Sequence, residues 1–237
     1  MSRRITVAVR LVLTIQSRAK FPHVYFGMTV FTVIVFRTLI PDELIPMVLP
    51  AFLFGEPGSL GVLMVAAHRY LERGERSVVA LLVTPLSSGE YVSALILGSA
   101  VLPTIAAALI QAGVQGFDGR VLLIVPPLYL IAVISGSIGL VLSTMFRDFT
   151  RFLVGSIPAI MIYSLPLLAF FELAPWWAFK WIPSDPALVV FGMLSHDAVS
   201  VPAYAGSVGL LGVFAAAAWW GAIATYSSRV RGEVEFA

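Results

Sequence analysis

Six long apolar segments dominate the sequence and restrict its fold more than any other feature. A transmembrane helix needs roughly 20 apolar residues to cross the hydrocarbon core of a bilayer. The segments of this length are residues 21–40, 47–67, 91–114, 121–145, 152–171 and 206–226. Charged residues make up only 12% of the 237-residue chain, where roughly 25% is usual for a soluble domain. The sequence therefore predicts an all-α, polytopic membrane protein in which six transmembrane helices form one domain over residues 1–237.

Arginine and lysine residues are unevenly divided between the two sides of this arrangement. Twelve of the 15 lie in the N-terminal segment, in the links after the second and fourth spans, and in the C-terminal tail. The other three are Arg37, Arg120 and Lys180. Because basic residues concentrate in cytoplasmic loops, we expect a multi-pass membrane protein with both termini in the cytoplasm.

Residues 1–20 have the pattern of an N-terminal amphipathic helix. Arg3, Arg10 and Ser17 recur every seven residues, opposite an apolar face. Basic amphipathic helices lie at the headgroup level of a membrane. We expect an interfacial helix here, which serves either as a docking element or as a plain positively charged anchor.

Residues 172–205 form the longest link between two spans. This link holds Trp176, Trp177 and Trp181, and the apolar run 187–194. The run is too short to span a bilayer, and tryptophan is enriched at membrane interfaces. The link therefore predicts a re-entrant or interfacial segment on the extracytoplasmic side, with an ordinary aromatic belt as the alternative.

Small residues four positions apart occur in two of the spans. Ser135 and Gly139 form one such pair, and Ala217 and Gly221 form the other. Pairs of this kind allow two helix backbones to approach closely. Each pair is therefore a candidate for a close helix–helix contact.

The sequence lacks the motifs of common enzyme and metal sites. A phosphate-binding P-loop needs a lysine between glycine and serine or threonine, but Lys20 and Lys180 follow alanine and phenylalanine. The three histidines lie in different segments, without the clustering that a metal site needs. We expect no catalytic residue, no metal and no cofactor on this chain.

Glu56 is an ionisable residue near the middle of the second span. A carboxylate at this depth is costly unless it faces a cavity or a partner. Pro57 follows it, and glycines occupy positions 55 and 58. Because proline removes a backbone donor and restricts the preceding residue, we expect the helix to be broken at 55–58. Glu56 and Pro57 would then line a translocation path that attracts cationic groups; the alternatives are a structural role for Glu56 or a position nearer the surface.

The link after the second span has a strong local pattern. Glu72 and Arg76 are spaced as a helical i, i+4 pair, and Pro85 ends that helix. Ser87 and Glu90 then have the spacing of a capping box, with Ser87 as N-cap of the third span. The pattern predicts a short cytoplasmic helix over residues 71–84, followed by a capped third span.

The stretch ERGERSVVALLVTPLSSGEYVSALIL resembles the segment after the second span in ABC-2-type transporter permeases. The matching residues are Glu72, Glu75, Arg76, Thr84, Pro85, Leu86, Ser87, Glu90 and Tyr91. The six-span layout, the N-terminal amphipathic helix and the apolar segment before the last span are also similar. Within that family, the chain is most similar to actinobacterial drug-export permeases of the fluoroquinolone type.

This resemblance implies the membrane subunit of an ATP-driven exporter in a bacterial plasma membrane. Such a subunit pairs with a second permease copy or a related permease, and with ABC ATP-binding subunits that carry the ATP and Mg. It would export a drug-like or amphipathic small molecule, as in antibiotic resistance, and needs no nucleic acid. The resemblance makes residues 71–84 the coupling helix, whose contacts to the ATPase would come from Glu72, Arg73, Glu75, Arg76, Val79, Thr84 and Pro85.

Two other functions remain open at this point. A secondary transporter could use Glu56 as the site of a coupling proton, because intramembrane carboxylates serve as proton relays. A membrane assembly protein without transport activity is the other alternative.

Overall fold

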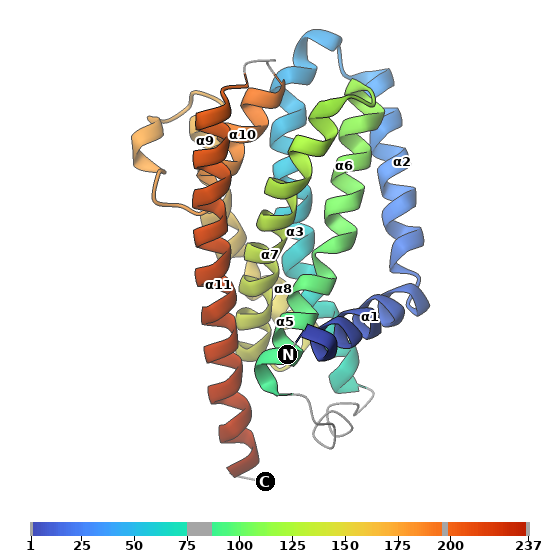
Figure 1. Cartoon of the computed structure of the whole chain (residues 1–237), viewed down its shortest axis with the longest axis vertical. Helices are drawn as coiled ribbons and strands as arrows, with labels where there is room; N and C mark the ends of the chain where they lie inside the picture. The colour runs from blue at the N-terminus through green and yellow to red at the C-terminus, as the bar shows by residue number, and fades with distance from the viewer. Residues whose placement is uncertain (1, 75–86, 196–198, 236–237) are drawn as a thin grey trace.

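The computed structural model describes residues 2–74, 87–195 and 199–235, and these residues fold into helices without any β-strand. Six helical stretches are long and apolar enough to cross a membrane, which confirms the predicted all-α, six-span fold. Their bounds are Phe21–Leu39, Asp42–Glu72, Ser88–Gln115, Gly119–Met145, Phe149–Phe170 and Val201–Ser228. The two ends of the chain lie at the same end of the bundle (Figure 1).

The helices have the following bounds. The first half of the chain forms α1 (Ser2–Arg18), α2 (Phe21–Leu39), the 3₁₀ turn η1 (Asp42–Leu44), α3 (Ile45–Gly74), α5 (Ser88–Ser99) and α6 (Val101–Gln115). The second half forms α7 (Gly119–Met145), α8 (Phe149–Ser164), α9 (Pro166–Phe170), the 3₁₀ turn η2 (Trp176–Ala178), α10 (Asp185–Ser195) and α11 (Val201–Glu235). The third span consists of α5 followed by α6.

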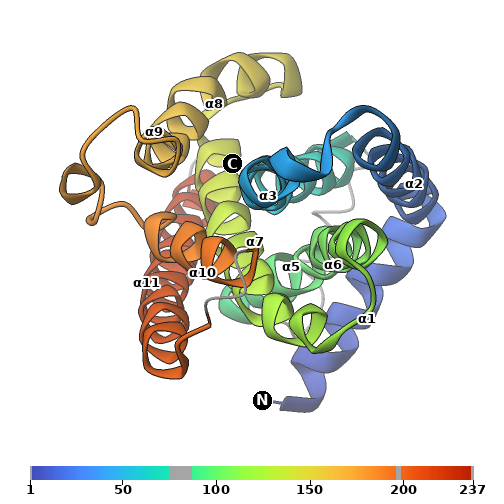
Figure 2. The ribbon, with the colours of Figure 1, turned by 90° about the horizontal axis from the view of Figure 1, so that it is seen from above.

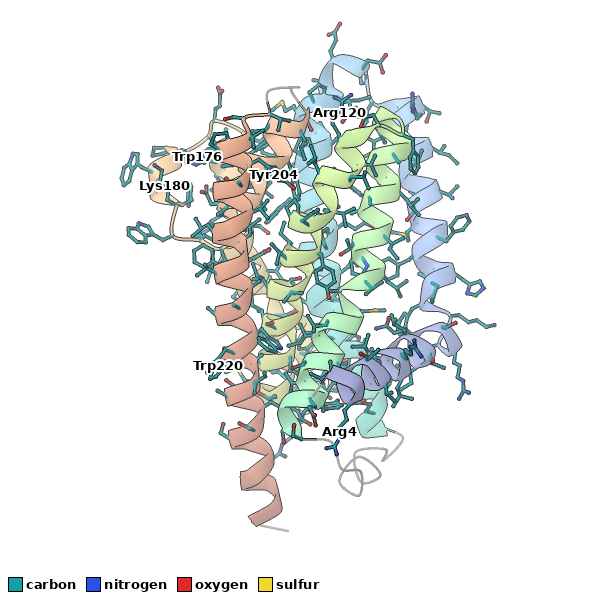
Figure 3. All side chains as sticks on the ribbon, in the orientation of Figure 1. Arg4, Arg120, Trp176, Lys180, Tyr204 and Trp220 are labelled. Atoms are coloured by element: carbon teal, nitrogen blue, oxygen red, sulfur yellow. The ribbon has the colours of Figure 1, made fainter. Side chains whose placement is uncertain are left out.

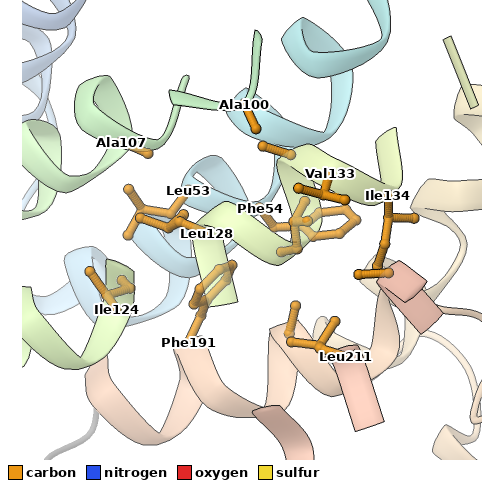
Figure 4. Packing of buried hydrophobic residues seen from close by; sticks show 14 of the residues in the cluster. Leu53, Phe54, Ala100, Ala107, Ile124, Leu128, Val133, Ile134, Phe191 and Leu211 are labelled. Atoms are coloured by element: carbon orange, nitrogen blue, oxygen red, sulfur yellow. The ribbon is translucent and has the colours of Figure 1, made fainter. Parts of the chain in front are cut away.

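Helices α3 and α7 lie at the centre of the bundle and pack against each other along their length. Helices α6 and α11 also pack on α7, and α10 packs on α3 (Figure 2). The core between these helices is apolar and includes Leu53, Phe54, Leu128, Ile134 and Phe191, each at most 1% exposed (Figure 4). Helices α2 and α8 lie at the edge of the bundle, with most of their side chains exposed.

Small residues bring the backbones of α3 and α7 into direct contact. A Cβ atom added at Gly139 would lie 2.8 Å from the Cα atom of Val62, and one added at Gly61 would overlap the hydroxyl of Ser135. The predicted pair Ser135 and Gly139 thus lies at a close helix contact. The other pair lies on an exposed face of α11, and a Cβ atom at Gly221 would meet nothing within 4 Å in this chain.

Helix α3 continues through Pro57, so the predicted break at 55–58 is wrong. A proline removes one backbone hydrogen bond, but in a transmembrane helix neighbouring helices and serine side chains compensate for the loss. The hydroxyl of Ser135 on α7 donates to the carbonyl of Pro57 at 2.8 Å. The hydroxyl of Ser59 donates to the carbonyl of Gly55 at 2.6 Å. Pro57 leaves the carbonyl of Leu53, four residues earlier, without its helical donor. The bond from Ser135 ties the α3 backbone to α7 at this point, and the packing of the two helices keeps both halves of α3 in line.

Aspartates fix the starts of two spans. Asp118 is the N-cap of α7 and accepts a hydrogen bond from the Arg120 amide at 2.9 Å. The side chain of Arg120 also donates to Asp118, and this bond holds the pKa of the carboxyl below its usual range. Asp148 caps α8 in the same way, through the Arg151 amide at 2.8 Å. Both turns therefore begin a helix at a defined residue.

The N-terminal segment is a helix, α1, that lies across the end of the bundle (Figure 1). Its apolar side packs on α5, where the side chain of Val12 fills the space beside Gly98. The Gln16 amide donates to the Ser99 hydroxyl at 3.1 Å. The amphipathic pattern of residues 1–20 therefore directs one face of the helix toward protein; its place at a membrane interface stays a prediction.

The link over residues 172–205 contains η2 and α10. Helix α10 packs against α3, α7 and α11, and Leu188 and Phe191 are fully buried. It lies near the end of the bundle that is opposite the two chain ends (Figure 1). Trp177 and Trp181 are 72% and 87% exposed. The apolar run is thus a packed helix of the bundle, while these tryptophans lie on the surface.

The contact between α3 and α7 predicts a specific sensitivity to side-chain size. Gly139→Val places atoms against the backbone of Val62, so we expect it to lower the free energy of unfolding by about 1–3 kcal/mol. The measurement is the apparent melting temperature of the purified protein in detergent. Gly221→Val is the matched control, because that position is open in this chain. Equal melting temperatures for the two variants would contradict the contact.

Candidate functional site

The described residues on either side of the expected coupling segment, at the end of α3 and the start of α5, lie at the end of the bundle that holds both chain ends (Figure 1). Helix α3 ends at Gly74 and α5 begins at Ser88. Glu72 and Arg73 lie in the last turn of α3. The remaining expected coupling residues lie outside the described residues; they are Glu75, Arg76, Val79, Thr84 and Pro85.

The start of the third span has the capping box expected from the sequence. The hydroxyl of Ser87 accepts a hydrogen bond from the Glu90 amide at 3.2 Å. The carboxylate of Glu90 accepts one from the Ser87 amide at 3.0 Å. This reciprocal arrangement satisfies two amides that would otherwise lack partners. The chain therefore enters the third span at a fixed residue directly after the link.

A polar cluster joins the end of α3 to two other helices. It consists of His68, Arg69 and Glu72 on α3, Tyr91 on α5 and Tyr226 on α11, and we call it the α3-end cluster. The Tyr91 hydroxyl donates to the Glu72 carboxylate, and the Nε2 atom of His68 lies 3.3 Å from that carboxylate. The Arg69 guanidinium lies 4.6 Å from the centre of the Tyr226 ring, and the two tyrosine rings are 5.5 Å apart.

Burial makes the α3-end cluster energetically important. His68 is 1% exposed and Arg69 is 6% exposed. Buried polar and charged groups are costly unless other groups pair with them. The Glu72 carboxylate beside His68 and the face of the Tyr226 ring beside Arg69 are electrostatic partners. The ring nitrogens of His68 and the Nε atom of Arg69 have no hydrogen-bond partner among the described residues. Separating α3 from α5 would take the Tyr91 hydroxyl away from Glu72, and separating α3 from α11 would take the Tyr226 ring away from Arg69, so the cluster holds the three helices together beside the link.

Sequence reasoning did not identify most of this cluster. In the sequence, Arg69 is one of the basic residues that indicate the orientation, and Tyr226 is the last residue of an apolar span. The spacing of His68 and Glu72, at i and i+4, places both on one helix face. That spacing is a local signal, but nothing in it indicates that Tyr226, far along the chain, lies opposite.

Glu56 lies on the opposite half of α3 from this cluster and is 9% exposed. One of its carboxylate oxygens, Oε2, has no hydrogen-bond partner among the described residues. Tyr25 on α2 lies within range of electrostatic interaction with it. Pro57, the other expected path residue, instead directs its carbonyl at Ser135 on α7. The structure thus turns the two neighbouring residues toward different helices.

No metal site occurs in the described part of the chain. Over residues 2–74, 87–195 and 199–235, no three histidine, aspartate or glutamate side chains gather to hold an ion. The α3-end cluster therefore offers polar contacts, and the site at Glu56 offers a buried carboxylate.

Comparison with known proteins links this architecture to drug export. The profile of the fluoroquinolones export permease protein family matches residues 3–230. Two relatives are fluoroquinolones export permease proteins of Mycobacterium tuberculosis, from the strains CDC 1551/Oshkosh and ATCC 25618/H37Rv. Each is 28% identical to this chain over 201 residues, which cover 84% of the chain and 83% of the relative. The match includes all six spans and the link between α3 and α5.

The α3-end cluster predicts that one hydroxyl stabilises the fold. Tyr91→Phe removes the donor to the Glu72 carboxylate, and hydrogen bonds to charged groups contribute about 1.5–3 kcal/mol. We expect a lower apparent melting temperature in detergent. Tyr204→Phe is the control, because the Tyr204 hydroxyl donates to a neutral, exposed carbonyl. If Tyr91→Phe destabilises the protein no more than Tyr204→Phe, the cluster does not hold the helices together.

Proposed function

Because the chain belongs to the fluoroquinolones export permease protein family, we propose that it is the membrane subunit of an ATP-driven exporter of drug-like, amphipathic molecules. The family match over residues 3–230 is the observation that carries this proposal. The six-span bundle provides the membrane part of such an exporter. The family also favours an exporter over a membrane assembly protein without transport activity.

The energy for export would come from a separate subunit. This chain has no P-loop lysine, so ATP and Mg would bind to an ABC ATP-binding partner. That partner would dock on residues 71–84. The capping box of Ser87 and Glu90 on one flank and the α3-end cluster on the other support this role. Both flanks are fixed to the bundle, so a push on the link would reach the helices rather than only bend the loop.

The α3-end cluster gives a route for that movement. Glu72 connects α3 to Tyr91 on α5, and Arg69 connects α3 to Tyr226 on α11. Closing of the ATPase would therefore displace the inner ends of three helices together. Export then follows as a shift between two packed states, each favoured by a different nucleotide state of the partner.

A second permease, identical or related, would complete the transporter. Helices α2 and α8 expose large apolar side chains along their length, including Phe26, Phe31, Val154 and Met161. Lipid and a second permease both offer the apolar surroundings that these side chains need. The substrate would pass between the two permeases.

Glu56 would act on the substrate from within the span. Its buried carboxylate has an oxygen without a partner among the described residues, and a cationic group of a substrate would supply one. The same carboxylate would be the proton site if the protein were an ion-coupled transporter. Membership of the export permease family favours the contact to a substrate over the site of a coupling proton.

Coupling through the link is tested by reversing one charge. With Arg76→Glu, we expect the amount of ATP-binding subunit that co-purifies, and its stimulation by the permease, to fall several-fold. Lys180→Glu is the control, because Lys180 lies at the opposite end of the bundle from Arg4 and the chain ends (Figure 3). Normal co-purification and normal stimulation with Arg76→Glu would refute the docking role of residues 71–84.

The role of Glu56 is tested separately. Glu56→Gln keeps the shape and removes the charge, so we expect several-fold weaker export of a cationic substrate from cells, with normal binding of the ATP-binding subunit. Glu43→Gln, at an exposed position in η1, serves as the control. Unchanged export and substrate affinity in Glu56→Gln would exclude Glu56 from the path.

A further inference from the structure

A groove lies between α9, the segment that follows it, and α10. Its volume is about 810 Å³. It lies near the end of the bundle opposite the two chain ends, on the side where Trp176 and Lys180 project (Figure 3). The lining residues that matter here are Phe170, Glu172, Trp176, Leu188, Gly192 and Met193. We call this feature the α9–α10 groove.

The groove is shallow and open to its surroundings, and its walls suit one face of a small organic molecule. Sites for drug-sized ligands usually have volumes of about 300–1,000 Å³ and mainly apolar walls with few polar groups. Phe170 and Trp176 supply aromatic surface, and Leu188 and Met193 supply aliphatic surface and a flexible thioether. Such walls bind the apolar body of a ligand.

Glu172 is the one charged residue among the described residues that line the groove. In the part of the chain that the structure describes, no arginine, lysine or histidine forms an ion pair with it. The nearby Lys180 acts electrostatically on Asp185 instead. The groove therefore combines apolar walls with an exposed carboxylate at its edge, which has no ion-pair partner in the described chain.

The backbone at Glu172 is in a conformation that favours glycine. Its φ is 59°, in the left-handed region. The Glu172 amide donates to the Ala169 carbonyl at 3.0 Å and the Leu173 amide to the Leu168 carbonyl at 2.8 Å. This is the Schellman pattern that ends a helix, in which glycine is the usual left-handed residue. A glutamate there costs conformational free energy, and such strained residues cluster at functional sites.

Gly192 keeps the floor of the groove open. A Cβ atom at this position would lie 3.5 Å from the ring of Phe170, so a larger side chain would occupy the space between α10 and that ring. Gly192 thus leaves an apolar space beside Phe170, and Glu172 adds a carboxylate at the edge of that space.

We propose that the α9–α10 groove binds amphipathic organic cations. The ammonium group pairs with the carboxylate of Glu172, and the apolar body packs against Phe170 and Trp176. Aromatic faces also attract cations directly. The inference names a substrate class for the proposed exporter and rests on that function. The groove lies at the end of the bundle where an exported molecule would be released.

Binding of a matched pair of probes tests this proposal. The probes are a fluorescent aryl compound with a trimethylammonium group and its neutral tert-butyl analogue, which has nearly the same shape. Binding is measured by fluorescence anisotropy with the purified permease in detergent, without ATP or an ATP-binding subunit. We expect the charged probe to bind the wild-type protein at least tenfold more tightly than the neutral one.

Two variants assign the binding to the groove. Glu172→Gly removes the carboxylate and relieves the backbone cost, so the protein folds at least as well, and we expect the preference for the charged probe to vanish. Gly192→Leu fills the floor and should weaken both probes at least tenfold. Glu43→Gln, outside the groove, is the control and should bind as the wild type does. An unchanged preference in Glu172→Gly, or unchanged affinities in Gly192→Leu, would overturn the proposal.

Two further measurements distinguish the proposed cation site from a lipid-binding site and from the proposed export function. Short-chain phosphatidylethanolamine also carries an ammonium group; if it displaced the probe at equal concentration, the groove would be a lipid site and the proposal would be wrong. The binding assay contains no ATPase. A permease that shows the expected binding but never stimulates an ATP-binding subunit would therefore refute the proposed function while leaving the groove assignment intact.

Discussion

The backbone contact between α3 and α7 is the constraint on which the rest of the bundle depends. At Gly61 and Gly139 the two helices approach so closely that neither position has room for a Cβ atom. Lipid tails are as apolar as leucine side chains, so close packing and hydrogen bonds between helices hold a membrane bundle together. Ser135 adds such a bond to Pro57. The remaining faces of this central pair then define the places of α6, α10 and α11.

This central pair also restricts how the protein can change shape. Where the two backbones touch, no long side chain lies between them that could change its conformation if one helix slid past the other. Packed interfaces of this kind switch between discrete arrangements rather than deforming continuously. Helices α2 and α8 bury far less of their surface. If the proposed export cycle keeps the α3–α7 contact, movement would fall on the less buried spans, which include α2, α8 and α11.

Local sequence patterns predicted the features that depend on local physics. Hydropathy located all six spans, because each span must satisfy its own backbone and present apolar side chains. The capping box of Ser87 and Glu90 was predictable for the same reason, since its two members are three residues apart. The predicted break at Pro57 failed because α7, which packs on α3 at this point, comes from a distant part of the sequence; its Ser135 is 78 residues away from Pro57.

Features that depend on distant partners could not be found in this way. Ser135 with Gly139 and Ala217 with Gly221 have the same spacing, yet the first pair lies at a helix contact and the second on an exposed face. The α3-end cluster could not be predicted from local patterns for the same reason, because Tyr226 lies on the last helix and Arg69 on the second span. The spacing of a pair shows which residues share a face, but not what that face meets.

The packing of α1 on α5 has a consequence for how the protein is made. The hydrogen bond from Gln16 to Ser99 joins residues that are 83 positions apart. A ribosome delivers the N-terminus first, so the buried face of α1, which includes Ala8 and Val12, lacks its main partner, α5, until the third span has been made. During that interval the membrane interface offers its apolar face a place to lie, as it does for other amphipathic helices. The amphipathic pattern of α1 thus serves the nascent chain as well as the finished bundle.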